Sequence, residues 1–290
     1  MSHPLSRSSG VALVLVSAFV FSTAGLFTKG VNTDAWGVIF WRGVAAALFT
    51  LTYMAIRGTL VAEVKAFRGP AILVTAVMAL GTAAFIPAFK LTSIANVTVI
   101  YAAAPFVAAA LSWVFIKEAP NRKTLIASVV SFAGVVLIVS GSLGSGTLTG
   151  DMLALWMTLM MSATMVIYRL WPNTTAALPA AMSSVVLLPV ALFYGEPFAA
   201  PPSEMPILIA FGLVFAIASV TLSEGARRLP ASETALLSTI ETPLAPLLAL
   251  LILTEYPAPL TVVGGSIIFF AVLWSQWPTR QTLHQRKRQI

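Results

Sequence analysis

Long apolar stretches, separated by short polar or turn-forming segments, follow one another along nearly the whole chain. Ten of them are long enough for a helix that crosses a bilayer, which needs roughly 20 apolar residues. Their Leu, Val, Ala and Ile runs lack the alternation of a membrane-spanning β-strand, so they predict helices. The predicted spans are 9–28, 34–56, 70–89, 93–116, 124–141, 151–170, 177–194, 205–226, 231–253 and 259–277. The expected fold class is an all-α integral membrane protein with ten transmembrane helices.

Composition supports a membrane protein and excludes several kinds of chemistry. Only 9% of the 290 residues are charged and the mean hydropathy is +0.92, whereas a soluble domain has about 25% charged residues. There is no cysteine, and His3 and His284 both lie in the tails, so neither thiol chemistry nor a histidine proton shuttle is expected in the membrane. We expect no cofactor and no metal.

Neither an enzyme nor a channel is favoured by the sequence. An enzyme acting on lipid-linked substrates would need a metal-ligand cluster, paired carboxylates or a glycine-rich phosphate loop, and the sequence offers none of these. A channel would need a ring of repeated charges or a filter-like loop, which is also lacking. The expectation is therefore that the protein is not an enzyme.

The basic residues predict the orientation of the chain. With the N-terminus placed inside, fourteen of the 17 Lys and Arg residues lie on the inner side, and only Lys29 and Lys90 lie outside. This bias predicts a multi-pass protein of the bacterial inner (plasma) membrane with both termini cytoplasmic. The basic tail at 286–288 is interpreted as a topology anchor, so the expected partners are the lipid bilayer and a small-molecule substrate, with no nucleic acid.

The two halves of the sequence look like copies of one pattern. Four residues recur 140 positions later: Gly10, Leu13, Ser22 and Lys29 match Gly150, Leu153, Ser162 and Arg169. Near the middle of each half, Lys90, Leu91 and Pro105 match Arg228, Leu229 and Pro243. Because each copy has an odd number of spans, the second must insert upside down. We therefore predict two inverted five-helix repeats, 1–148 and 149–290, an architecture of secondary transporters with the substrate site near the bilayer midplane.

The same segments carry a resemblance to a known family. Residues 90–96, Pro105 and 111–118, with their copies at 228–233, Pro243 and 250–255, resemble the signature of the EamA family of the drug/metabolite transporter (DMT) superfamily. Within it the chain is most similar to YddG-type exporters of aromatic amino acids. The second copy is one residue shorter between Pro243 and Glu255. The resemblance implies a central cavity lined by spans one, three, four, six, eight and nine.

Helical spacing and the repeat suggest which residues line such a cavity. In span four, Thr98, Tyr101 and Pro105 fall on one helical stripe, and Thr239 and Pro243 are repeat partners in span nine. Each proline removes a backbone donor near mid-membrane, which is tolerated where the carbonyl lines a cavity or is satisfied by Ser or Thr. An ordinary helix kink is the alternative.

Other candidates are small hydroxyl residues and aromatic side chains. The hydroxyl residues of spans one and six fit cavity lining and close helix packing equally well, and Trp156 fits a lipid-facing position as well as a cavity wall. The predicted substrate-binding residues are Ser22, Thr23, Phe85, Thr98, Tyr101, Pro105, Trp156, Ser162, Ser238, Thr239 and Pro243.

Two charged residues, Glu241 and Arg42, lie inside predicted spans and are candidate coupling residues. A charge at the centre of a membrane helix costs at least about 2.5–3.5 kcal/mol on insertion scales. The alternatives are an ion pair between the two or a protonated Glu241. For Arg42 the interpretation as a helix brace is favoured, whereas Glu241 is a candidate for binding a substrate ammonium or carrying a proton.

The sparse charge favours a neutral or zwitterionic substrate over a phosphorylated one, which would need several Lys or Arg residues. The leading hypothesis is a secondary transporter that exports amino acids, aromatic and other neutral ones, or similar small metabolites by alternating access. The alternative is a proton-coupled exporter of drugs or organic cations that uses Glu241. The sequence leaves the preferred substrate and the oligomeric state open.

Overall fold

The computed structural model describes residues 7–117, 119–144, 146–226, 228, 234 and 237–276, and within them every regular element is a helix. Eight helical stretches are long and apolar enough to cross a membrane, and two further apolar helices, Glu241–Leu253 and Pro259–Ser275, are shorter. The protein is therefore a multi-pass membrane protein. Predicted spans nine and ten contain these two shorter helices.

The first half contains α1 (Arg7–Ser22), α2 (Ala24–Lys29), α3 (Ala35–Ile56), α4 (Leu60–Ala66), α5 (Gly69–Leu91), α6 (Ile94–Tyr101), α7 (Ala104–Ile116) and α8 (Arg122–Gly141). The second half contains α9 (Leu148–Leu170), α10 (Ala177–Tyr194), η1 (Pro197–Ala199), α11 (Met205–Ala226), α13 (Glu241–Leu253) and α14 (Pro259–Gln276). Side-chain caps start several of these helices, as where Asp34 accepts from the backbone N of Trp36 at 2.8 Å, which satisfies an otherwise unpaired donor.

Three predicted spans are interrupted among the described residues, and one of them is span nine, where the turn residues Thr239 and Ile240 precede α13. Span one is interrupted at Thr23 between α1 and α2, and span four at Ala102 and Ala103 between α6 and α7. Pro105 lies in the first turn of α7 and Pro243 in the first turn of α13. The missing N–H of proline is tolerated at a helix start, so each proline marks the beginning of a new segment.

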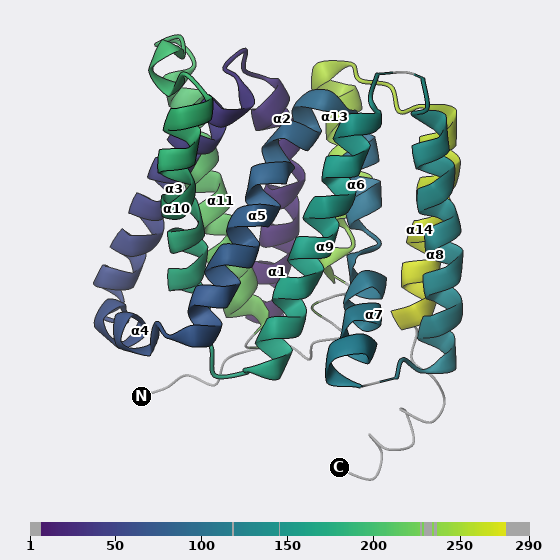
Figure 1. Ribbon diagram of the computed structural model, residues 1–290, viewed down its shortest axis with the longest axis horizontal. Helices are drawn as coiled ribbons and strands as arrows, with labels where there is room; N and C mark the ends of the chain where they lie inside the picture. The colour runs from purple at the N-terminus through teal and green to yellow at the C-terminus, as the bar shows by residue number, and fades with distance from the viewer. Residues whose placement is uncertain are drawn as a thin grey trace.

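The helices pack into one bundle in which α5 lies against α9 and α11 lies against α1 (Figure 1). Helix α3 packs against α10 and α11, and α8 pairs with α14 at the right-hand side. Helices α8 and α14 approach closely, since a Cβ built on Gly264 would lie 2.6 Å from the carbonyl oxygen of Gly134. In Figure 1 the pair α1 and α2 runs from the lower to the upper edge of the bundle, whereas α9 runs from the upper to the lower edge.

A buried polar network joins five segments near the upper edge. Asp151 at the start of α9 accepts hydrogen bonds from Thr92 Oγ1 at 2.7 Å, from Asn96 Nδ2 at 3.0 Å and from Ser142 Oγ. Thr261 Oγ1 in α14 donates to Asn96 Oδ1. All five side chains are buried. Buried charge is stable only when its lone pairs are satisfied, and here three donors satisfy one carboxylate.

Another carboxylate, Glu204, fastens the loop before α11 to the loop between α2 and α3. It accepts hydrogen bonds from Asn32 N at 2.8 Å, Thr33 N at 3.0 Å and Thr33 Oγ1 at 2.6 Å. Glu204 is buried and lies outside the membrane-spanning helices. The hydrogen bond from the Thr33 side chain, followed by those from the backbone, lowers the pKa of Glu204 from 4.5 to about 2.

The lowered pKa of Glu204 predicts a pH-dependent stability. Because the pKa of Glu204 in the folded protein is below its value in the unfolded chain, its stabilising contribution is present above about pH 4.5 and is lost as the pH falls towards 2. We expect the melting temperature of the wild type in detergent to fall as the pH is lowered over this range. Glu204→Gln should have a lower melting temperature at neutral pH, and its melting temperature should fall less. An equal fall in melting temperature with pH in the two proteins would contradict this prediction.

Candidate functional site

The candidate site lies where the interrupted helices meet. Helix α13 packs against α6, α1 and α2, and α9 packs against α6 and α7. Tyr101, at the end of α6, packs on the same buried cluster as Phe85, Leu26 and Met161. Glu241, the first residue of α13, is close enough to Tyr101 for the two groups to interact electrostatically. The structure therefore places Tyr101 of span four near Glu241 of span nine, and Phe85 of span three packs on the same buried cluster as Tyr101.

Four of the predicted hydroxyl side chains donate to backbone carbonyls. Ser22 and Thr23 donate to Phe19 O and Val20 O, both at 2.6 Å, at the interruption between α1 and α2. Thr98 donates to Ile94 O at 2.9 Å. Such local bonds compete with helix hydrogen bonds and bend helices, which accounts for an interruption at Thr23 without a proline there.

Ser162 makes the same kind of bond between two helices. From α9 its Oγ lies 2.7 Å from Thr158 O and 3.0 Å from Ala104 O, at the start of α7, so that its one proton is shared between the two carbonyls. A hydroxyl has one proton but two lone pairs. With their protons directed to carbonyls, these hydroxyls keep oxygen lone pairs of the kind that an ammonium group needs, and the Ser22 and Ser162 side chains are buried.

One hydroxyl, that of Tyr101, is a candidate hydrogen-bond donor of the site, and Phe85 provides aromatic surface. No hydrogen bond from the Tyr101 hydroxyl is found within the described part of the chain, so this hydroxyl is a donor available to a carboxylate. The Phe85 ring packs edge-on against Phe89, with 5.0 Å between ring centroids.

Ser238 and Thr239 are half-buried and lie just before Glu241, the first residue of α13. The carbonyl of Thr239 accepts from Thr242 N at 3.1 Å.

Three predicted residues lie on exposed surface. Pro105 and Pro243 are exposed, and the Trp156 side chain is 45% exposed. Pro105 lines a pocket of about 520 Å³ between α7, α9 and the start of α8, together with Ala108, Ser112, Asn121 and Arg169 among others. The structure does not bring Trp156 into this pocket, and its role as a cavity wall stays a prediction.

Arg42 is buried between α3 and α11. Its guanidinium carbon lies 4.5 Å from the ring centroid of Phe215 and 5.4 Å from that of Phe211, and its buried Nε has no hydrogen-bond partner among the described residues. Among the described residues, no ion pair joins Arg42 and Glu241. Cation–π contacts across two helices are suited to a brace, because desolvated ones contribute about 2 kcal/mol.

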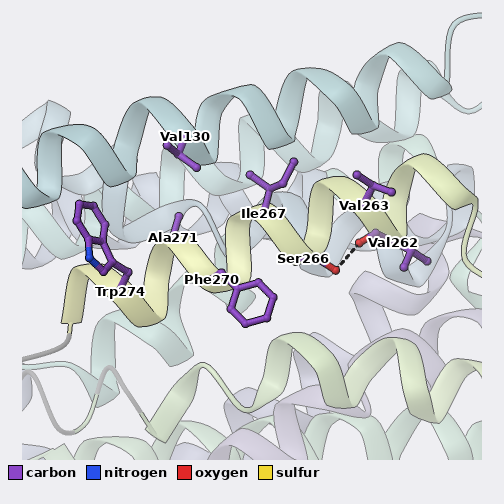
Figure 2. A pocket seen from close by; sticks show the side chains of 8 residues that line it. All are labelled: Val130, Val262, Val263, Ser266, Ile267, Phe270, Ala271 and Trp274. Atoms are coloured by element: carbon purple, nitrogen blue, oxygen red, sulfur yellow. Dashed lines mark hydrogen bonds between the residues drawn. The ribbon is translucent and has the colours of Figure 1, made fainter.

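A second pocket, of about 580 Å³, lies along the pair α8 and α14 and is lined almost entirely by apolar side chains (Figure 2). Val130 of α8 faces the side of α14 that carries Ile267 and Ala271, whereas the Phe270 ring points away from α8. It contains no residue of the predicted binding set. No group of three or more His, Cys, Asp or Glu residues that could hold a metal ion occurs among the described residues.

Asp151 and its network were not singled out by the sequence, and neither was the contact between Lys29 and Glu255, where Nζ lies 2.6 Å from Oε2. An acidic residue at the start of an apolar span was the one signal for Asp151. Its direct partners lie between 9 and 59 residues away along the chain, and Thr261, which donates to Asn96, lies 165 residues from Asn96, so no local pattern connects them.

Comparisons with known proteins agree with this architecture. The model of the EamA-like transporter family matches the chain twice, over residues 8–140 and 148–276. The "Uncharacterized transporter YwfM" of Bacillus subtilis (strain 168) is 27% identical over 272 residues, covering 90% of this chain and 91% of that protein. A solved crystal structure shares the fold with a TM-score of 0.65 at 17% identity, covering 93% of this chain and 97% of its own. The chain therefore belongs to the EamA-like transporter family, within the drug/metabolite transporter superfamily, and is a membrane transporter rather than an enzyme.

Proposed function

We propose that this transporter exports amino acids, aromatic and other neutral ones, or similar small metabolites, by alternating access between two inverted five-helix repeats. Three observations support the repeat: the family model matches each half once, α1 and α9 run in opposite directions, and α5 packs on α9 as α11 packs on α1. In inverted repeats the substrate site lies between the halves near the bilayer midplane.

The proposed topology places the lower edge of Figure 1 in the cytoplasm of a bacterium. Among the described residues, the basic side chains of that edge outnumber those of the upper edge, which are Lys29 and Lys90. Both upper lysines are engaged: Lys29 pairs with Glu255, and Lys90 Nζ donates to Val31 O at 2.6 Å. An excess of Lys and Arg on one side is the usual mark of the cytoplasmic face.

The observation that supports an amino-acid substrate is that both hydrogen-bond acceptors and a hydrogen-bond donor occur where the interrupted helices meet. Hydroxyl oxygens of Ser22, Thr23 and Ser162 serve as acceptors and the Tyr101 hydroxyl as a donor. A zwitterion needs acceptors for its ammonium and donors for its carboxylate, and little fixed charge. The aromatic ring of Phe85 adds apolar surface of the kind that fixes large side chains in binding pockets.

We expect Tyr101→Ala and Thr239→Val each to reduce amino-acid counterflow in proteoliposomes, by about tenfold where a hydrogen bond to a charged group is lost. Tyr101→Phe keeps the ring and removes only the hydroxyl, so it separates the two contributions. Thr52→Val, at an exposed position of α3, is the matched control and should leave flux unchanged. Wild-type flux in both site variants, at equal membrane insertion, would remove these residues from the site.

A second candidate function is export of drugs or organic cations coupled to protons through Glu241. It is favoured by one observation, a carboxyl group at the start of α13 beside Tyr101 at membrane depth. A carboxylate binds a cation directly and also carries a proton when it is protonated. One substitution, Glu241→Gln, separates this function from amino-acid export.

A further inference from the structure

Glu255 follows α13 at the upper edge of the bundle and contacts two other helical segments. Its Oε2 accepts from Lys29 Nζ, the last residue of α2, at 2.6 Å. Its Oε1 accepts from the backbone N of Ile94, the first residue of α6, also at 2.6 Å. One carboxylate therefore joins α2, α6 and α13, the upper segments of the three helices that contribute Thr23, Tyr101 and Glu241 to the candidate site.

The surroundings of this carboxylate favour the contact. The start of α6 carries a partial positive charge, which stabilises an anion placed there, and both contacts are charge-assisted. The side chains of Lys29 and Glu255 are 24% and 19% exposed, so water screens the pair only in part. Just below this carboxylate, α2 and α6 are in close contact at Gly25 and the fully buried Ile94. A Cβ atom added to Gly25 would lie only 2.8 Å from Ile94 Cγ1, so no side chain larger than that of glycine fits there without a shift.

The equivalent position in the other half has different surroundings. Arg169, the sequence counterpart of Lys29, lies at the opposite end of the bundle and lines the pocket of about 520 Å³ that reaches Pro105 in the first turn of α7. Glu118, the counterpart of Glu255, lies outside the described residues. Lys29 thus lies in a closely packed region at the upper edge, and its counterpart Arg169 borders a pocket at the lower edge.

We propose that Glu255 and Lys29 form a latch that closes the upper entrance to the hydroxyl-lined site and must open once in each transport cycle. The inference rests on the alternating-access mechanism proposed above. Opening breaks one ion pair and one hydrogen bond and lets α2 separate from α6. A contact present in one of two conformations biases the equilibrium between them by its own free energy.

The chain contains no cysteine, so a single introduced thiol reports access without background. Ser22→Cys places it in the site, at a position 1% exposed, and a membrane-impermeant maleimide is added on the Lys29 side. We expect Lys29→Gln or Glu255→Gln to accelerate labelling about tenfold, the shift that removal of a charge-assisted contact produces. Equal labelling rates with and without the latch would overturn the proposal.

Glu224→Gln is the matched control for the labelling experiment. It removes an ion pair of similar exposure, 16% for Arg228 and 22% for Glu224, whose members are four residues apart in sequence. Such a pair does not connect α2 with α6 or α13. We expect this variant to label at the rate of the Ser22→Cys protein alone; faster labelling would show that any lost ion pair opens the bundle and would overturn the specific role of Glu255.

A cross-link tests the same latch in the opposite sense. In Lys29→Cys with Glu255→Cys, a short reducible bis-methanethiosulfonate should stop phenylalanine counterflow, and a reductant should restore it, while the same reagent should leave each single-cysteine variant at its own untreated flux. Undiminished flux in the cross-linked protein would overturn the latch. The labelling assay needs no substrate, so a wild type that moves no amino acid yet labels faster after Lys29→Gln would support the latch and refute the proposed substrate.

Discussion

Replacing Asp151 with alanine is expected to destabilise the protein by at least about 3 kcal/mol, because the substitution leaves three buried donors without their acceptor. Thr92, Asn96 and Ser142 all donate to this carboxylate, and each is buried. The hydroxyls can rotate towards other acceptors, but the Asn96 amide is held by Thr261 on its other side. The effect should appear as a lower melting temperature in detergent and a smaller folded fraction after purification.

The matched control for Asp151 is another carboxylate at a helix start. Asp34 caps α3 by accepting from Trp36 N and Gly37 N but is itself exposed. Loss of such a cap costs about 1 kcal/mol, so Asp34→Ala should have the smaller effect. If Asp151→Ala melted at the temperature of Asp34→Ala or above it, the buried network would not be a main contributor to stability.

Glu241→Gln is expected to abolish any amino-acid flux driven by a pH gradient while leaving counterflow at symmetric pH within about threefold of wild type. Glutamine keeps the shape and hydrogen-bonding atoms of the side chain but cannot carry a proton, and a general proton carrier must be titratable. The remaining acceptors of the site, the hydroxyls of Ser22, Thr23 and Ser162, are unchanged. Both fluxes are measured on the same proteoliposomes.

The other outcomes for Glu241 identify other mechanisms. Loss of counterflow and gradient-driven flux together, with Glu241→Asp retaining both, would make Glu241 the ammonium-binding group. Collapse of organic-cation efflux with no amino-acid flux in wild type would favour the proton-coupled cation exporter instead. Unchanged gradient-driven flux would contradict a coupling role for Glu241.

Much of the fold follows from local pattern. Hydropathy placed eight of the ten predicted spans on helices long enough to cross a membrane, and the remaining two on the shorter helices α13 and α14. The family membership predicted from Pro105, Pro243 and their neighbouring segments is confirmed by the double match of the family model. The likeness to YddG-type exporters, the inversion of the repeats and the binding residues stay predictions.

Local pattern did not reveal the interruption at Thr23, because no proline lies there and the helix is broken by hydroxyls that bond to Phe19 and Val20 carbonyls. Nor did it reveal the surroundings of Arg42. The sequence offered Glu241 as a counter-charge, whereas the packing of α3 on α11 places Phe211 and Phe215 at the guanidinium. Gly212 permits that packing, since a Cβ there would lie 2.7 Å from Arg42 O.

The sequence by itself determined that the chain lies in a membrane as a series of helices, because the cost of placing unpaired backbone groups in lipid depends on the length and polarity of each segment alone. Only the tertiary structure decided which polar side chains meet: Asp151 with donors from three other segments, and Glu255 with Lys29 and the start of α6. These contacts depend on how helices distant in sequence pack together, and the periodicity of a single helix carries no record of that packing.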